Sequence, residues 1–254
     1  MDPLLLGALL ATVFFANIYA SSVGGASLLI LPMMFLAGIP ANIAVGTNRL
    51  HRVFATGTGA AKYLKNVKID FRHLWFYAIS TAIGAVVGAF IVVSIDKTAL
   101  ELIISIFLLA LAVFFLVKKD FGMKEKKEKP VKKSLAFTGI AMFAISVYRS
   151  IFGSAAGTFL RVYLVVKDGL SFLQASAYAS LIANIGNIFA VIIFGWAGII
   201  DYWIALYMII VGSAGSYIGA HLAIKKGNEF VRKIFLLLAI ITSLRLIAGI
   251  AFGI

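Results

Sequence analysis

The feature that most constrains the fold of this 254-residue chain is an internal duplication that needs no gap. A shift of 131 positions places identical small or acidic residues of the two halves on one another. The matched pairs are Gly38 with Gly169, Ala44 with Ala175, Asp70 with Asp201, Gly84 with Gly215, and Gly88 with Gly219. Each half of the chain is therefore expected to build the same set of elements.

The two copies carry their positive charge in loops that do not correspond. In copy one the loop around Asp70 is basic and the next loop, Ser94–Thr98, is nearly neutral. In copy two the loop around Asp201 has no Lys or Arg, and the next loop is basic. Lys and Arg in short loops mark the cytoplasmic side of a membrane. The exchange therefore predicts two repeats inserted upside-down to one another, which is typical of secondary transporters.

Composition also favours a membrane protein over a soluble one. The chain is 62% hydrophobic with a mean hydropathy of +1.05, beyond the apolar fraction of soluble domains. Of its 23 Lys and Arg, 16 lie in the loops Lys62–Arg72, Lys118–Lys133 and Lys225–Lys233. The net charge of +13 is therefore explained by cytoplasmic loops of a protein that lies in the lipid bilayer. No nucleic acid is expected as a partner. The absence of Cys excludes disulfides, thiol nucleophiles and Cys-based metal sites.

Apolar segments of two lengths follow one another along the chain, judged against the roughly 20 residues that a spanning helix needs. The long segments are Leu4–Ser21, Ala41–Lys62, Phe71–Ser94, Thr98–Val117, Ser134–Ile151, Ser171–Phe194, Tyr202–Ile224 and Phe230–Ala248. Two short segments, Gly25–Ala37 and Ala156–Lys167, are related by the same shift, and each follows a run of small residues. Paired short segments interrupted by Gly are the best sequence pointer to a transporter's binding site.

The basic loops also predict the topology. Between Lys133 and Asp201 the chain must cross the membrane an odd number of times, which holds if the short segment passes through. The prediction is an all-α polytopic membrane protein of the cell membrane, with two inverted repeats of five helical segments each, one of them short and broken. The repeats cover residues 1–117 and 134–254, the basic cytoplasmic linker covers 118–133, and both termini lie outside. Re-entrant short segments would instead give eight spans and parallel repeats; the charge exchange favours ten.

Arginine is the charged residue found deep within the apolar segments. Arg49 and Arg52 lie well inside Ala41–Lys62 and Arg161 lies in the second short segment, whereas all ten acidic residues lie at segment ends or in loops. An Arg in hydrocarbon costs at least about 2.5–3.5 kcal/mol and needs a partner or a water-filled cavity. With no carboxylate nearby, a small anionic substrate is the predicted partner. Arg149, just before the second break, is equally well explained by hydrogen bonds to backbone carbonyls.

Polar and small residues near these arginines complete the predicted site. The glycines of the breaks are expected to allow close backbone approach, and the helix N-termini after them to add N–H groups. The predicted substrate-binding residues are Arg49, Arg52, Arg161, Thr47, Asn48, His51, Gly24, Gly25, Gly157, Asn184 and Asn187. Interhelical hydrogen bonding is an equally good account of the two Asn of copy two. His51 is a weak candidate for carrying a coupling proton, and the three His show no metal spacing, so no metal, cofactor or catalytic residue is expected.

The same residues carry a family resemblance. Gly24-Gly25 leading to Pro32, then Gly38-Ile39-Pro40, Ala44 and Gly46-Thr47-Asn48, resemble the first signature of the TauE/SafE sulfite-exporter family. Gly153 to Gly157, then Gly169, Ala175 and Gly198-Ile199-Ile200-Asp201, are similar to its second-repeat signature. The resemblance covers nearly the whole chain and implies an anion transporter for sulfite, sulfoacetate, thiosulfate or a related sulfur or organic anion. Copy two departs from the pattern at Ala155-Ala156, Arg161 and Tyr163.

The predicted function is therefore a secondary transporter, exporter or importer, that moves sulfite or an organosulfur or carboxylate anion by alternating access. An anion-selective, channel-like pore would use the same arginines, and an accessory membrane subunit without activity of its own is the further alternative. An enzyme is disfavoured, because the chain lacks Cys, His clusters and paired deep carboxylates. The direction of transport, the coupling ion and the oligomeric state, a homo-oligomer included, are left open.

Overall fold

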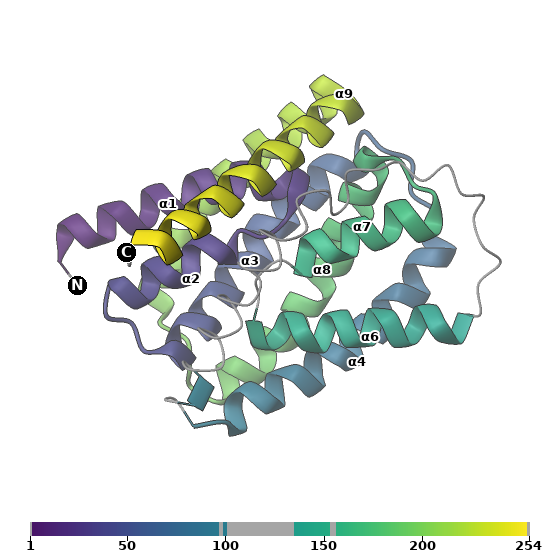
Figure 1. Ribbon diagram of the computed structural model, residues 1–254. Helices are drawn as coiled ribbons and strands as arrows, with labels where there is room; N and C mark the ends of the chain where they lie inside the picture. Colours follow the sequence, from purple (N-terminus) through teal and green to yellow (C-terminus); the bar gives the residue numbers. More distant parts are fainter. Residues whose placement is uncertain (1, 97–98, 101–134, 153–155, 253–254) are drawn as a thin grey trace.

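The computed structural model describes residues 2–96, 99–100, 135–152 and 156–252, with side chains as far as Gly227. These residues form helices throughout (Figure 1). The helices are α1 (Pro3–Val23), α2 (Ser27–Leu36), α3 (Ala41–Leu64), α4 (Phe71–Ser94), α6 (Leu135–Phe152), α7 (Ala156–Asp168), α8 (Phe172–Trp196) and α9 (Tyr202–Phe252). The fold is thus all-α, as the sequence predicts. The linker 118–133 and the predicted span Thr98–Val117, apart from residues 99–100, lie outside the described residues.

Helix α9 contains the two last predicted spans. Its backbone breaks at Gly227, which has φ 72°, a left-handed value that glycine adopts without a steric penalty. The helix turns at this point, so that its second half runs back along the molecule toward the end where the N-terminus lies (Figure 1). The first half, Tyr202–Gly227, is long and apolar enough to cross a membrane, as are helices α1, α4 and α8.

The helix boundaries follow the duplication. Shifting α3 by 131 residues gives 172–195, and α8 is Phe172–Trp196. The same shift carries α2 onto α7 and α1 onto α6 to within about two residues at each end. Gly38 and Gly169, which precede α3 and α8, both have positive φ values, 77° and 65°. The two halves therefore share one helical pattern, including one short helix each.

The most extensive helix contacts join one helix of the first half to one helix of the second half. Helix α9 packs most extensively on α1, and its counterpart α4 packs on α6 (Figure 1). Both contacts are made by glycines at equivalent positions: a Cβ built at Gly88 would lie 2.7 Å from the Val147 carbonyl oxygen. At Gly219 the same addition would overlap the carbonyl oxygen of Ile18. These small residues therefore allow the helices to pack closely, as small residues do at helix interfaces in membranes.

Contacts along each pair give the helix directions. Gly215 approaches Phe14 as Gly219 approaches Ile18, so α1 and α9 are parallel, and Gly84–Phe143 with Gly88–Val147 makes α4 and α6 parallel. Contacts of Thr47 with Asp201 and of Gly59 with Ser216 align α3 with α9.

Helix α8 runs against α3 and with α4. Arg49 contacts Asn187, and Gly57, further along α3, contacts Asn184, which comes earlier in α8. Helices α3 and α8 are therefore antiparallel. Thus α1, α3 and α9 run one way and α4, α6 and α8 the other. Helices α1, α3 and α4 are therefore antiparallel to their counterparts α6, α8 and the first half of α9, a geometry compatible with inverted repeats.

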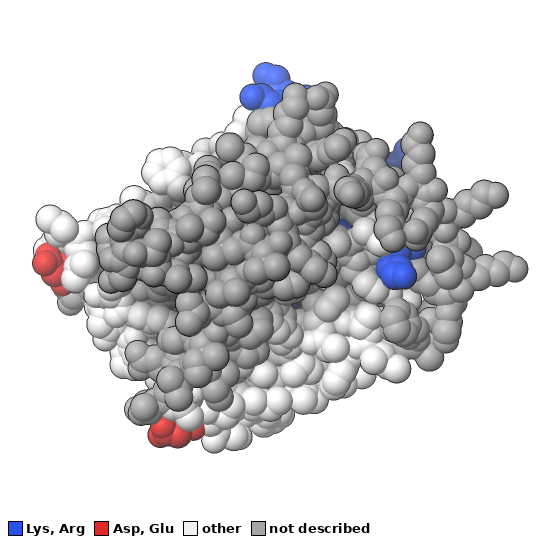
Figure 2. Space-filling view, in the orientation of Figure 1, with Lys and Arg blue, Asp and Glu red and all other residues white. Residues whose placement is uncertain are grey.

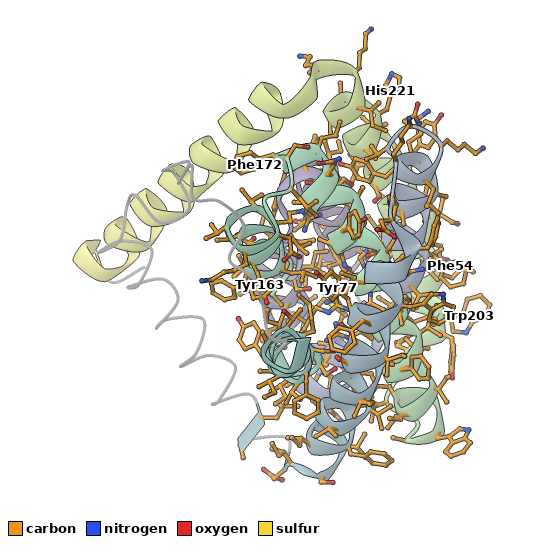
Figure 3. All side chains as sticks on the ribbon, turned by 90° about the vertical axis from the view of Figure 1, so that its right-hand side faces the viewer. Phe54, Tyr77, Tyr163, Phe172, Trp203 and His221 are labelled. Atoms are coloured by element: carbon orange, nitrogen blue, oxygen red, sulfur yellow. The ribbon has the colours of Figure 1, made fainter. Side chains whose placement is uncertain are left out.

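The surface has the features of a membrane protein. Figure 3 shows Phe54 and Trp203 pointing away from the helix bundle, and their side chains are 50% and 74% exposed. Lys and Arg lie toward one end of the molecule, and the visible Asp and Glu lie on the opposite sides (Figure 2). Among the residues whose side chains the structure describes, the exposed lysines are Lys65, Lys68, Lys167, Lys225 and Lys226. Such a separation of charge is expected when one end faces the cytoplasm.

Candidate functional site

A cavity of about 550 Å³, counting the space at its mouth, lies where the two broken regions of the chain meet. Its walls come from the end of α1, the start of α2, the middle of α3 and α8, the end of α6, the start of α7, and α9. The lining residues are Ala20, Ser21, Gly24, Gly25, Ala26, Ser27, Arg49, Arg52, Thr56, Arg149, Gly157, Arg161, Ala179, Ser180, Ala183, Asn187 and Ser216. The cavity is thus enclosed by both repeats.

Equivalent positions of the two repeats line this cavity together. The 131-residue shift pairs Arg49 with Ser180, Arg52 with Ala183, Thr56 with Asn187, and Ala26 with Gly157, and all of these residues line it. The backbone positions are therefore related by the duplication, but the charge is not. Copy one supplies arginines where copy two supplies a serine and an alanine.

Two of the four lining arginines hold the ends of the helices that stop at the cavity. Arg161 Nη2 donates to the carbonyl oxygens of Ala20 at 3.2 Å and Ser21 at 3.1 Å, in the last turn of α1. Arg49 Nη2 donates to the carbonyl oxygens of Arg149 at 2.5 Å and Ser150 at 3.1 Å, in the last turn of α6. The last carbonyls of a helix have no partner within the helix. These guanidinium groups donate to them, and in α1 the Gly24 N–H and the Tyr63 hydroxyl donate to the same two oxygens.

The other two arginines keep most of their donors unused. A guanidinium has five N–H groups. Among the described residues, Arg52 donates only to Asn17 Oδ1, at 2.8 Å, and Arg149 donates only to the carbonyl oxygen of Ala183. The Nε of Arg49 and the Oγ1 of Thr56 are buried without a hydrogen-bond partner in the described part of the chain. Buried polar groups are normally paired, so this cavity has an excess of hydrogen-bonding capacity.

The charge of the cavity is also unbalanced. Arg49, Arg149 and Arg161 are 5%, 7% and 7% exposed. Within the described residues, every hydrogen-bond acceptor of the four arginines is a backbone carbonyl, an Asn amide or a Ser hydroxyl. Neutral acceptors solvate a guanidinium but do not cancel its charge. A buried cluster of like charges needs a counter-charge, and the described part of the lining contains no carboxylate.

The backbone adds a further positive element. Helix α2 begins beside the cavity after Gly24 and Gly25, whose φ values are 90° and 83°, and no side chain caps its N-terminus. Gly24 lies against Gly157 at the start of α7, where a Cβ on Gly24 would be 2.7 Å from the Gly157 carbonyl carbon. Two short helices therefore start at the cavity, and helix N-termini favour anions.

The cavity gathers most, but not all, of the predicted substrate-binding residues. Those that line it are Arg49, Arg52, Arg161, Gly24, Gly25, Gly157 and Asn187. Asn48 and His51 are buried behind the wall: Asn48 bonds to the lining residue Ser27, and His51 bonds to Asn48 and Asn17. Thr47 Oγ1 accepts a hydrogen bond from the Asp201 amide at 2.9 Å, at the start of α9. Asn184 contacts Gly57, and its Oδ1 has no partner among the described residues.

Several lining residues were not among the predicted ones. Arg149 was recognised as a deep charge, yet its position beside the second break fitted a backbone role equally well. Ser180, Thr56 and Ser216 carry no signal by themselves. The duplication supplies a sequence signal for Ser180 and Thr56, because the 131-residue shift pairs them with the predicted residues Arg49 and Asn187. Among the described residues, no three His, Cys, Asp or Glu side chains form a group that could hold a metal ion.

Comparison with known proteins agrees with this architecture. The family model "Sulfite exporter TauE/SafE" matches residues 9–246. A probable membrane transporter protein, ORF9, of Sinorhizobium sp is 26% identical over 244 residues, which is 96% of this chain and 93% of the relative. The probable membrane transporter protein YfcA of Escherichia coli (strain K12) is 26% identical over 249 residues, 97% of this chain and 91% of the relative.

A probable membrane transporter protein of Haemophilus influenzae is 22% identical over 243 residues, which is 96% of this chain and 94% of the relative. No solved structure matches the chain. The family match covers almost the entire chain, and the relatives are named as transporters. The chain, a multi-pass membrane transporter and not an enzyme, belongs to the sulfite exporter TauE/SafE family.

Proposed function

We propose that this transporter carries a small anion, sulfite or an organosulfur or carboxylate anion, by alternating access at the arginine-lined cavity. The observation that carries the proposal is the cluster of Arg49, Arg52, Arg149 and Arg161 at the junction of the repeats, with neutral partners throughout the described residues. A bound anion supplies the missing negative charge. It also accepts hydrogen bonds from the unused donors of Arg52 and Arg149, and charge-assisted bonds of this kind are strong.

The walls of the cavity support a compact substrate. Its apolar lining residues are alanines and glycines, and its other side chains are Arg, Ser, Thr and Asn. Among its described lining residues there is no leucine, valine or aromatic side chain. A long hydrocarbon tail would find no apolar surface there, whereas oxygen atoms find donors on several sides. Small sulfur oxyanions and short organic acids fit this chemistry.

The arrangement of the repeats supports alternating access. Two inverted units enclose one central site, and rocking one unit against the other would expose that site to each side in turn. We propose that repeats 1–117 and 134–254, joined by the cytoplasmic linker 118–133, make this movement in the cell membrane. The lysine-rich end would face the cytoplasm and both termini would lie outside.

Counterflow in liposomes that contain the purified protein tests the proposal. Vesicles loaded with unlabelled sulfite, thiosulfate, sulfoacetate, sulfate, acetate or phosphate are diluted into the same labelled anion. We expect uptake of one sulfur or carboxylate anion to saturate and to rise when that anion is present inside. Uptake that is not stimulated from the opposite side would indicate a channel-like pore. No uptake of any anion would indicate an accessory subunit and would contradict the proposal.

A further inference from the structure

A chain of buried polar side chains behind the cavity wall connects two residues that line it. Arg52 Nη1 donates to Asn17 Oδ1 at 2.8 Å, and Asn17 Nδ2 lies 3.1 Å from His51 Nε2. On the other side of the ring, His51 Nδ1 lies 3.3 Å from Asn48 Oδ1, and Asn48 Nδ2 donates to Ser27 Oγ at 3.0 Å. Arg52 and Ser27, the two ends, line the cavity from α3 and α2.

The donors and acceptors of Asn17 are determined by its neighbours. A guanidinium can only donate, so the Asn17 atom that faces Arg52 must be the oxygen. A carbonyl oxygen can only accept, and Asn17 Nδ2 donates to the Val13 carbonyl at 2.8 Å. The second hydrogen of the same Nδ2 is then directed at His51, so that Nε2 of the ring must accept it.

This assignment decides the state of the histidine. A ring that accepts at Nε2 is neutral and carries its hydrogen on Nδ1. That hydrogen is donated to Asn48 Oδ1, which leaves Asn48 Nδ2 to donate to Ser27. A protonated ring would direct an N–H at the N–H of Asn17, with the positive charge of Arg52 next to it in the sequence. Within the described residues, each member of the chain therefore has a defined role when His51 is neutral.

Packing holds the ring in this position. His51 is completely buried, with 0% exposure. From α9 it is met by Gly212, where an added Cβ would lie 2.7 Å from His51 Cδ2. From α1 it is met by the neutral Asn17, and the charged groups closest in sequence on its own helix are Arg49 and Arg52. The described surroundings thus supply no negative charge that would stabilise a protonated ring.

We infer that His51 is a positioning residue that stays neutral, and that the Asn17–His51–Asn48 relay orients Arg52 and Ser27 toward the transported anion. Because Ser27 Oγ accepts from Asn48, its own hydrogen is free to be donated into the cavity. Because Asn17 Oδ1 accepts from one nitrogen of Arg52, the rest of the guanidinium is held in a fixed direction. This inference rests on the proposed function, since it assigns Arg52 to anion binding.

Two substitutions separate positioning from proton transfer. His51→Gln retains an acceptor for Asn17 and a donor for Asn48 but cannot take up a proton near neutral pH. His51→Phe retains the ring and removes both hydrogen bonds. We expect anion uptake by His51→Gln to keep the KM and the pH profile of the wild type between about pH 5 and 8. In His51→Phe the KM should rise about tenfold, as for the loss of a hydrogen bond to a charged group.

His221→Gln, at an exposed position of α9, is the matched control and should behave as the wild type. The inference is overturned if His51→Gln keeps the KM but loses a pH-dependent rate, because His51 would then carry a proton. It is also overturned if His51→Phe leaves the KM unchanged.

Nitrogen NMR of protein labelled at histidine gives a readout that does not depend on transport. The His51 signal is assigned by its loss in His51→Gln. We expect a neutral ring with hydrogen on Nδ1 throughout the range from about pH 5 to 8, and titration within this range would contradict the relay. If the wild type transports none of the anions, the proposed function fails, while the NMR spectrum still decides the state of His51.

Discussion

At the scale of single residues, the four cavity arginines divide into two kinds that look alike in the sequence. Arg49 and Arg161 each direct Nη2 at two carbonyl oxygens in the last turn of a helix, α6 and α1 respectively. Arg52 and Arg149 each donate one hydrogen bond to the described protein. The depth of a charge in an apolar segment indicates that it needs a partner. Which partner it finds depends on the helix across the interface, and the sequence of one segment does not contain that information.

Substitution of each kind should have a different effect. Arg52→Gln and Arg149→Gln should weaken anion binding at least about tenfold through the loss of charge-assisted hydrogen bonds, with little loss of stability. Arg161→Gln should lower the melting temperature in the absence of anion, because the carbonyl oxygens of Ala20 and Ser21 each lose one of their two donors. Equilibrium binding and thermal unfolding of the purified variants measure the two effects. Lys65→Gln, at the exposed C-terminal end of α3, is the control, and equal stability losses in all variants would refute the division.

A carboxylate placed beside Arg52 should compete with the substrate. Asn17→Asp keeps the shape of the side chain that accepts from Arg52 at 2.8 Å but supplies an internal negative charge. An opposite charge within about 4 Å stabilises a buried cation and replaces the charge that the anion would supply, so we expect the affinity for the anion to fall at least about tenfold. Asn66→Asp, at an exposed position after α3, should leave the affinity unchanged. Unchanged affinity in Asn17→Asp would show that Arg52 does not contact the anion.

At the scale of helices, the sequence predicted more than at the scale of residues. The predicted Ala41–Lys62 and Ser171–Phe194 became α3 (Ala41–Leu64) and α8 (Phe172–Trp196), and the short segment Ala156–Lys167 became α7 (Ala156–Asp168). Apolar length and glycine breaks determine where a helix starts and stops, and two copies give each boundary twice. The inward direction of Arg149 and the contact of Thr47 with Asp201 arise from packing between helices, which no single segment encodes.

The exchange of partners between the repeats should be sensitive to added volume. Gly88→Ala would place a methyl group 2.6 Å from the Cβ of Ser150, and Gly219→Ala would place one against the backbone of Ile18. Each should cost about 1–3 kcal/mol, as for overpacking of a close interface, and should lower the melting temperature. Gly7→Ala on α1 meets nothing within 4 Å and serves as the control. A melting temperature for Gly88→Ala equal to that of Gly7→Ala would contradict the tight α4–α6 contact.

At the scale of the whole molecule, the account depends on the two repeats having opposite orientation. The structure supports this through helix directions and through the separation of lysines and carboxylates (Figure 2). The sequence contained the same information in its exchanged loop charges. It contained none on how the two units fit together, because the contacts between α1 and α9 and between α4 and α6 join distant parts of the chain.

The absence of Cys makes the orientation directly measurable. Lys65 and Trp196 are equivalent positions under the 131-residue shift, and Trp196 is 91% exposed. With inverted repeats, a membrane-impermeant maleimide added to intact cells should label Trp196→Cys and spare Lys65→Cys. The pair Ile95→Cys and Lys226→Cys should show the same contrast, with Ile95→Cys labelled. Equal labelling of both members of a pair, after permeabilisation shows that both react, would indicate parallel repeats.

Equilibrium binding of radiolabelled sulfite and thiosulfate to the purified protein decides whether an anion occupies the arginine cavity. The wild type should bind one of these anions saturably, and the double variant Arg52→Gln/Arg149→Gln should lose that binding while remaining folded. Competition by the other anions of the transport panel would then rank the substrates. If the double variant binds as tightly as the wild type, or if the wild type binds no anion of the panel, the cavity is not the substrate site.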